Sequence, residues 1–230
     1  MKKIILILVI VAITIACKSE DYVQITPETY NILSLGDSYT KGQGVCETCG
    51  YPAQLKDSLV TKFNSEDSFN LKVIAETGWT TTNLINGIEN ENLTNTYDLV
   101  TLLIGVNNQF QSRPFSLFEE EFPELVNTTV EFAKGKKENV IIISIPDYSN
   151  TGFGQATGGP VITEELTAYN TYINNYCNAN NLNFIDAQSL IFVAQTNPEL
   201  IASDNLHPSE LAYSNLVKQL LPLAYDILLE

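Results

Sequence analysis

The stretch Asn31-Ile32-Leu33-Ser34-Leu35-Gly36-Asp37-Ser38-Tyr39-Thr40 decides the fold. Its apolar first half is typical of a buried strand. Gly36 then allows a sharp turn, so that Asp37 and Ser38 follow directly where the strand ends. Ligands bind at the carboxyl ends of the strands in open α/β sheets, which makes Ser38 a candidate nucleophile. Taken alone, the stretch is better explained with Ser38 as a turn residue or a helix N-cap, because Gly, Asp and Ser mark turns in general.

Outward from this stretch, short apolar runs alternate with segments of helical character. The runs predict strands at Ile32–Leu35, Leu71–Ala75, Leu99–Ile104, Val140–Ile145 and Phe184–Ile185. The segments between and after them predict helices at 51–63, 81–90, 117–133, 164–179 and 210–229. Such alternation favours right-handed crossovers and a parallel sheet that is covered on both faces. We therefore expect one α/β domain over residues 30–230, with a parallel sheet of about five strands.

The composition limits the classes of partner. The chain of 230 residues has 12 Lys and Arg against 27 Asp and Glu, a net charge of −15. An acidic surface repels phosphate backbones and anionic headgroups, so nucleic-acid binding and charge-driven membrane binding are disfavoured. The chain has one histidine, His207. A metal site with several histidines is therefore excluded, and any reaction that needs an imidazole must use His207.

Residues 1–16 resemble the signal peptide of a bacterial lipoprotein. A positively charged start and an apolar run at residues 4–13, too short to span a bilayer comfortably, precede Cys17. In such proteins the cysteine is lipidated and becomes the mature amino terminus. Thr14 stands where leucine is usual, and an ordinary secretory signal with an incidental Cys17 is the alternative. Residues 17–29 are polar and predict a tether. The resemblance implies a lipid-anchored protein of the bacterial cell envelope, on its periplasmic or cell-surface side.

Polar residues and glycines follow several predicted strands at the point where each ends. Ser38, Gly78 and Asn107 follow the first three strands, and Asp204 and His207 lie in the loop before the last helix. Because the carboxyl ends of parallel strands share one edge, we expect these five residues to converge. Their types fit acyl transfer, which needs a serine nucleophile, an imidazole base and a carboxylate that orients the base. The backbone N–H groups of Ser38 and Gly78 and the amide of Asn107 could donate to a developing oxyanion.

Four short blocks in this order resemble those of the SGNH, or GDSL-type, hydrolase superfamily. They are Gly36-Asp37-Ser38, Gly78, Gly105-Val106-Asn107-Asn108 and Asp204-Asn205-Leu206-His207-Pro208. The resemblance covers about residues 30–229. The chain departs from the usual blocks at Tyr39, where leucine is common, and at Asn108, where aspartate is common. We expect Asn108 to alter local hydrogen bonding without loss of activity.

The resemblance implies a flavodoxin-like three-layer α/β/α hydrolase of carboxylic esters that needs no metal or other cofactor. Ser38 would be the nucleophile, His207 the base and then the acid, and Asp204 the residue that orients His207. Activity would rise as His207 loses its proton near neutral pH. The substrate would be a small-molecule, lipid or carbohydrate ester. The alternative is a non-catalytic envelope lipoprotein that binds glycan or lipid on the same fold, although the intact serine, aspartate and histidine argue against it.

Two further features concern the loops around Ser38. Cys46-Glu47-Thr48-Cys49 lies in a glycine-rich loop, whereas a thioredoxin-like motif would open a helix after a strand, and zinc would need two more ligands. We therefore expect a local disulfide between Cys46 and Cys49, outside the cytoplasm. Aromatic residues in the strand-end loops predict an apolar cleft, lined by Trp79, Phe110, Phe115, Tyr148 and Phe153. Asp37 is expected to brace its turn by local hydrogen bonds.

Overall fold

The structure, a computed structural model, describes residues 26–230. The signal peptide predicted at residues 1–16, Cys17 and most of the tether at 17–29 lie outside the described residues. In the part that is described, no helix has both the length and the apolar character needed to cross a membrane.

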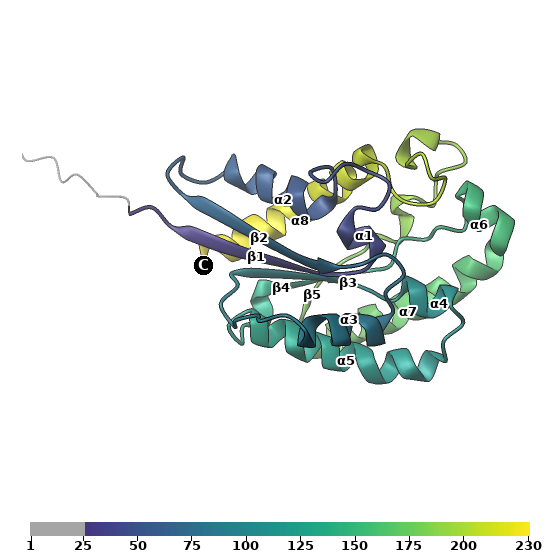
Figure 1. Ribbon diagram of the computed structural model, residues 1–230, viewed down its shortest axis with the longest axis horizontal. Coiled ribbons are helices and arrows are strands. Elements are labelled where there is room, and N and C mark those ends of the chain that lie inside the picture. Colours follow the sequence, from purple (N-terminus) through teal and green to yellow (C-terminus); the bar gives the residue numbers. More distant parts are fainter. Residues whose placement is uncertain (1–25) are drawn as a thin grey trace, which may run out of the picture.

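Five parallel strands form the sheet in residues 26–230, in the order β2-β1-β3-β4-β5 (Figure 1). They are β1 (Thr29–Gly36), β2 (Ser68–Ala75), β3 (Leu99–Leu103), β4 (Val140–Ile143) and β5 (Asn183–Ile185). Every residue of β3 and β4 is buried, because helices cover both faces of the sheet. This strand order is the flavodoxin-like one, in which the chain reverses direction across the sheet between β1 and β3.

Helices pack on both faces of this sheet (Figure 1). One face carries α2 (Tyr51–Val60) and α8 (Glu210–Leu229), which contact each other. The opposite face carries α3 (Thr81–Glu89), α5 (Phe115–Phe132) and α7 (Pro160–Asn180). One continuous apolar core joins the helices to the sheet. The three-layer α/β/α sandwich expected from the sequence is therefore confirmed.

Several elements differ from the sequence prediction. Three short helices lie in segments for which the sequence predicted no helix: α1 (Ser38–Lys41), α4 (Val106–Phe110) and α6 (Gly152–Thr157). Helices of one or two turns are too short to show an apolar period. Single 3₁₀ turns also occur at η1 (Lys137–Asn139), η2 (Gln188–Leu190) and η3 (Pro198–Leu200). The first two strands and the helices α5 and α7 begin two to four residues earlier than predicted, and β1 includes Thr29 from the expected tether.

The turn after β1 places Ser38 at the carboxyl edge of the sheet. A Cβ at Gly36 would lie 2.2 Å from Oγ1 of Thr40 and 2.3 Å from the carbonyl oxygen of Leu103, so only glycine fits there. The chain therefore turns from β1 directly into α1. Figure 1 shows α1 and α4 at this edge, whereas β1 enters the sheet at the opposite edge, at Thr29.

Candidate active site

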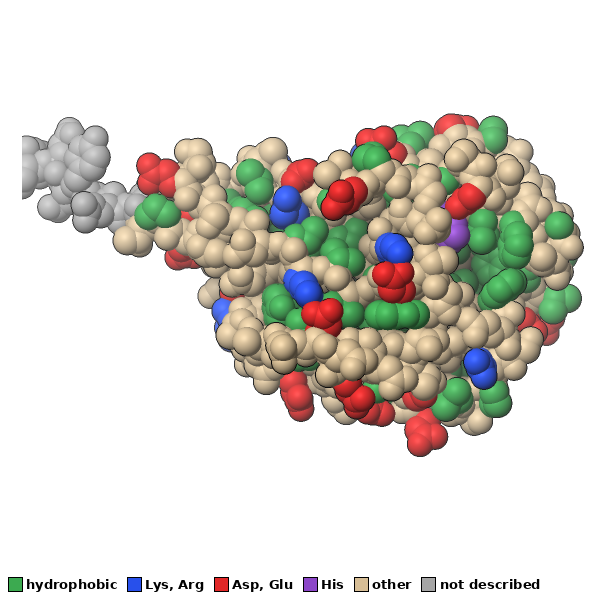
Figure 2. Space-filling model, in the orientation of Figure 1, with side chains coloured by type: hydrophobic (Ala, Val, Ile, Leu, Met, Phe, Trp, Pro, Cys, Tyr) green, Lys and Arg blue, Asp and Glu red, His purple; other side chains and the backbone are tan. Residues whose placement is uncertain are grey.

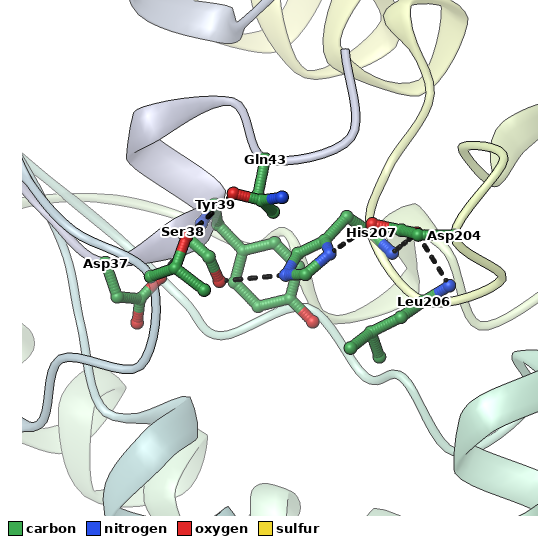
Figure 3. Close-up of polar contacts among 8 residues, drawn as sticks. Asp37, Ser38, Tyr39, Gln43, Asp204, Leu206 and His207 are labelled. Carbon is green, nitrogen blue, oxygen red and sulfur yellow. Dashed lines mark hydrogen bonds and ion pairs between the residues drawn. The ribbon is translucent and has the colours of Figure 1, made fainter.

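Ser38, His207 and Asp204 form one chain of hydrogen bonds, although Ser38 and Asp204 are 166 positions apart in the sequence (Figure 3). The Oγ atom of Ser38 lies 3.0 Å from Nε2 of His207. Nδ1 of His207 lies 2.7 Å from Oδ2 of Asp204. Ser38 and His207 are both buried. This is the arrangement in which a carboxylate orients an imidazole and the imidazole takes a proton from a serine.

The loop before α8 fixes the carboxylate of Asp204. Its Oδ1 atom accepts from the backbone N–H groups of Leu206, at 3.0 Å, and of His207, at 2.9 Å. Asn205 takes the left-handed conformation, φ 61°, that this tight turn requires. Burial raises the pKa of Asp204, but the hydrogen bonds from His207 and Leu206 outweigh it, so the pKa lies below its usual value. Asp204 is therefore a carboxylate at neutral pH.

Candidate oxyanion donors lie around Ser38. Ser38 is the first residue of α1, so its backbone N–H has no acceptor within the helix. Gly78 and Asn107 line the same cavity as Ser38 and His207. One amide hydrogen of Asn107 is used in a 3.0 Å bond to the carbonyl of Trp79. An amide has two such hydrogens, so the second is a candidate donor to an oxyanion. The five residues predicted to converge are thus brought to one place.

Asp37 braces the turn before the nucleophile candidate. Its Oδ1 atom accepts from the backbone N–H of Tyr39 at 3.0 Å and caps α1. Its Oδ2 atom is buried and has no hydrogen-bond partner among residues 26–230. Burial raises the pKa of Asp37 to about 7, against the opposing effect of the backbone hydrogen bonds from Tyr39 and from Asp37 itself. Asp37 therefore carries little negative charge below neutral pH.

Asn108 joins the third strand-end loop to the start of α3. Its Oδ1 accepts from the backbone N–H of Thr81 at 2.9 Å, and its Nδ2 donates to the hydroxyl of Thr81 at 2.6 Å. That hydroxyl donates in turn to Glu121. Because the proton of Thr81 is committed to Glu121, position 108 must supply a donor, which an amide does and a carboxylate does not. The departure at Asn108 thus has a local explanation.

An apolar cavity of about 190 Å³ adjoins Ser38. Figure 2 shows the single histidine at the rim of a hollow with apolar side chains around it. Its apolar lining comes from Val106, Phe110, Tyr148, Phe153 and Leu206. Two of the aromatic residues expected in this cleft lie elsewhere. Trp79 packs against Gly87 of α3, and Phe115 packs against Tyr169 of α7, with ring centroids 4.8 Å apart.

The comparisons with known proteins agree with this geometry. Residues 34–214 match the model of the GDSL-like Lipase/Acylhydrolase family. The chain belongs to this family. As a GDSL-like acylhydrolase it is a hydrolase of ester bonds. No curated protein sequence matches the chain.

Solved structures similar to this GDSL-like chain share its fold at low identity. A lipase/acylhydrolase from Enterococcus faecalis is 20% identical with a TM-score of 0.65, over 86% of this chain and 96% of that one. The psychrotrophic esterase EstA from Pseudoalteromonas sp. is 16% identical with a TM-score of 0.61, over 87% of this chain and 99% of that one. The acetylxylan esterase Axe2 from Geobacillus stearothermophilus is 18% identical with a TM-score of 0.57, over 85% of this chain and 94% of that one.

Some residues around this GDSL-like site were not singled out from the sequence. Gln111 holds the loop of Gly78 by donating to its carbonyl oxygen at 2.8 Å. Gln43 accepts from the hydroxyl of Thr77 at 2.8 Å. The loop that follows Gln43 contains the disulfide between Cys46 and Cys49 that was expected from the sequence. The only sequence signal for Gln43 was its place in the glycine-rich loop directly after the nucleophile candidate.

Proposed function

We propose that the protein is a serine esterase that cleaves carboxylic esters through an acyl-enzyme on Ser38. The observation that carries the proposal is the continuous hydrogen-bond chain from Ser38 Oγ through His207 to Asp204, beside an apolar cavity. A serine needs such a base because its hydroxyl is a weak nucleophile when protonated. Membership of an acylhydrolase family supports the same chemistry.

The reaction has two halves. Ser38 Oγ attacks the ester carbonyl carbon while its proton passes to Nε2 of His207, and the carbonyl oxygen becomes an oxyanion. The N–H groups of Ser38 and Gly78 and the amide of Asn107 stabilise that charge. The carbon–oxygen bond to the alcohol breaks, and the alcohol leaves with the proton of His207. Water then repeats the attack on the acyl group, which releases the acid and restores Ser38.

The acyl part is short. The cavity beside Ser38 measures about 190 Å³, below the roughly 300–1,000 Å³ of sites that bury drug-sized ligands. Its apolar walls favour a small alkyl group over a charged one. We therefore propose esters of acetate and other short carboxylic acids as substrates. One of the similar structures is an acetylxylan esterase, which is consistent with a short acyl group.

Hydrolysis of p-nitrophenyl esters of increasing chain length tests the proposal. Wild-type protein should hydrolyse the acetate and butyrate, and Ser38→Ala should lower kcat by roughly 10³-fold or more. Ser116→Ala, a change at an exposed serine on α5, is the matched control and should retain wild-type rates. A fluorophosphonate should label wild-type protein on Ser38 alone. Equal rates for wild type and Ser38→Ala at every chain length would instead favour the non-catalytic lipoprotein.

We propose that the mature protein is attached to a bacterial envelope membrane by a lipid on Cys17. The proposal rests on the sequence resemblance of residues 1–16 to a lipoprotein signal. Cell fractionation tests it. The wild-type protein should be found with membranes and Cys17→Ser in the soluble fraction, whereas an unchanged distribution would contradict the anchor.

A further inference from the structure

The Cys46–Cys49 disulfide closes a small ring in the loop that joins α1 to α2. We name residues 42–50 the disulfide loop. The cysteines are three positions apart in the sequence, and the backbone N–H of Cys49 donates to the carbonyl of Cys46 at 2.9 Å. A ring this short constrains the unfolded chain less than a long one does, so it contributes less to overall stability. Its effect falls mainly on the shape of the loop itself.

The disulfide loop contacts the nucleophile candidate and the loop of Gly78. The backbone N–H groups of Gly42 and Gln43 both donate to the carbonyl of Ser38, each at 3.0 Å. The side chain of Gln43 accepts from the hydroxyl of Thr77 at 2.8 Å, and Thr77 directly precedes Gly78. Figure 3 shows the Gln43 side chain close to the reacting serine. The first residues of the disulfide loop are therefore part of the site.

The same loop packs against the carboxylate that orients His207. Gly44 lies against Oδ2 of Asp204 and Cβ of Ala202, with no room for a side chain at position 44. This oxygen of Asp204 is the one bonded to Nδ1 of His207. Gly44 is only two positions before Cys46 in the sequence. A change in the path of the loop at Cys46 would therefore move the backbone that lies against Asp204.

One end of the disulfide ring is anchored to the helices. The carbonyl of Cys49 accepts from Nε2 of Gln54 on α2 at 2.6 Å, and the same Nε2 donates to the carbonyl of Glu210 on α8 at 3.1 Å. Through the disulfide this anchor also holds Cys46. Glycines such as Gly44 give the loop backbone wide freedom once the cross-link is open. The disulfide therefore fixes the loop where it meets the orienting carboxylate.

The cross-link is accessible to a reductant, because Cys46 is exposed and Cys49 is half-buried. A thiolate of a dithiol can attack Sγ of Cys46, which breaks the S–S bond, forms a mixed disulfide and releases Cys49 as a thiolate. The second thiol of the dithiol then attacks the mixed disulfide and releases Cys46. The dithiol leaves as its own disulfide, and its two electrons and two protons stay on the two cysteines.

We propose that the Cys46–Cys49 disulfide is a reversible redox site that sets the rate of ester hydrolysis through Asp204. In the oxidised protein the loop holds Gly44 against the carboxylate. Reduction by a dithiol releases the loop, Asp204 loses its fixed contact with His207, and hydrolysis slows while the fold persists. This inference rests on the proposed esterase function, because the rate that is controlled is that of the esterase. The two cysteines are positioning residues, since they do not line the cavity beside the nucleophile.

Reversible reduction tests the proposal. The wild-type protein is reduced with dithiothreitol, freed of it by gel filtration under nitrogen, and later reoxidised with oxidised glutathione. Because a displacement of about 1 Å can cost about 10²-fold in rate, kcat for p-nitrophenyl acetate should fall by roughly tenfold or more. KM should change little, and kcat should recover on reoxidation.

Variants separate this disulfide from other thiols. The double variant Cys46→Ser with Cys49→Ser should have the low kcat without reduction and should not respond to dithiothreitol. Cys177→Ala, which removes the buried free cysteine of the described residues, is the matched control and should respond like the wild type. A response that persists in the double variant would overturn the assignment to Cys46 and Cys49.

The histidine gives a readout that a general loosening of the protein would not move. Because His207 is the only histidine, isotopic labelling of histidine gives one imidazole in an NMR spectrum. The resonance of the proton on Nδ1 reports the hydrogen bond to Asp204. Reduction should shift this resonance and reoxidation should restore it, while the midpoint of thermal unfolding stays close to that of the oxidised protein.

Two results would overturn the redox site: an unchanged kcat in the reduced wild-type protein, or a lower kcat with an unchanged His207 resonance. Absence of ester hydrolysis by the oxidised wild type would instead refute the esterase function. The resonance would then still show whether the disulfide controls Asp204, and a resonance that does not shift would overturn that coupling as well.

Discussion

Gly44 lies directly against the carboxylate of Asp204, so that a Cβ added at Gly44 would stand 2.8 Å from Oδ2. This is the oxygen that holds the ring of His207. The loop that contains the Cys46–Cys49 disulfide therefore packs against the orienting carboxylate. Gly44 also has φ +87°, a conformation that favours glycine. The loop after the nucleophile thus helps to set the geometry of the histidine.

Substitution of Gly44 should lower both stability and activity, whereas a similar change at a glycine far from the site should lower stability alone. Gly44→Ala should lower the free energy of unfolding by about 1–2 kcal/mol, because alanine disfavours the left-handed backbone conformation. The new Cβ should also push Asp204 away from His207. Gly135→Ala is the matched control, because Gly135 has φ +73° and open space around its Cβ position. Thermal unfolding should show a larger loss of stability for Gly44→Ala than for Gly135→Ala, because the new Cβ would also lie 2.9 Å from Cβ of Ala202. Only Gly44→Ala should lose kcat, by tenfold or more, and equal kcat in the two variants would contradict this role.

Asn108→Asp should destabilise the protein although it restores the commoner family residue. The new carboxylate oxygen would face the hydroxyl of Thr81, whose proton is bonded to Glu121. Two acceptors would then meet in a buried place, at a cost of about 1–3 kcal/mol in the free energy of unfolding. Urea denaturation measures this cost.

The double variant Asn108→Asp with Glu121→Gln is the control. The glutamine amide can donate to Thr81, which frees the threonine hydroxyl to donate to the new carboxylate. The double variant should therefore recover most of the lost stability. If the double variant instead loses as much stability as the two single variants added together, the hydrogen-bond chain through Thr81 does not determine which residue fits at position 108.

Asp37 should make the protein less stable as the pH rises from 4 to 7. Its pKa is raised from 3.8 to about 7 by burial, so in this range the folded protein holds a proton that the unfolded chain has lost. The contribution of Asp37 to the free energy of unfolding is fully present below pH 4. It is lost as the pH rises through 7, at roughly 1.4 kcal/mol per pH unit. In Asp37→Asn this contribution to the pH dependence of the free energy of unfolding should disappear, while the amide oxygen can still accept the hydrogen bond from the backbone N–H of Tyr39. Urea denaturation from pH 4 to 8 measures the difference, and parallel curves for the two proteins would rule out the raised pKa.

The apolar cavity should set the preference for acyl length. Phe153 lies beside Phe110, with ring centroids 5.7 Å apart, and both line the cavity. Phe153→Ala should enlarge it and shift the optimum of kcat/KM among p-nitrophenyl esters from acetate or butyrate to longer chains. Phe192→Ala, at a half-exposed phenylalanine that does not line this cavity, should keep the wild-type optimum. A profile that does not change in Phe153→Ala would place the acyl group elsewhere.

The sequence predicted the sheet and the meeting of Ser38 with His207, because both depend on strong local signals. Buried strands are continuous apolar runs, and the ends of parallel strands must share an edge. The contact of Gly44 with Asp204 could not be predicted in this way, since it joins two loops whose spacing depends on the packing of α2 and α8. Trp79 and Phe115 were placed wrongly because a single aromatic residue in a loop carries no period that tells which side it faces.

The entry of β1 at the edge opposite Ser38 has a consequence for orientation. Eight residues of strand, roughly 26 Å, separate Thr29 from that catalytic edge. A chain fixed to a lipid at Cys17 would reach Thr29 over at most about 40 Å. If Cys17 carries an anchor, the lipid is attached on the side of the sheet opposite the catalytic edge, and a tether of this length leaves that edge free to face either the membrane or the space beyond it.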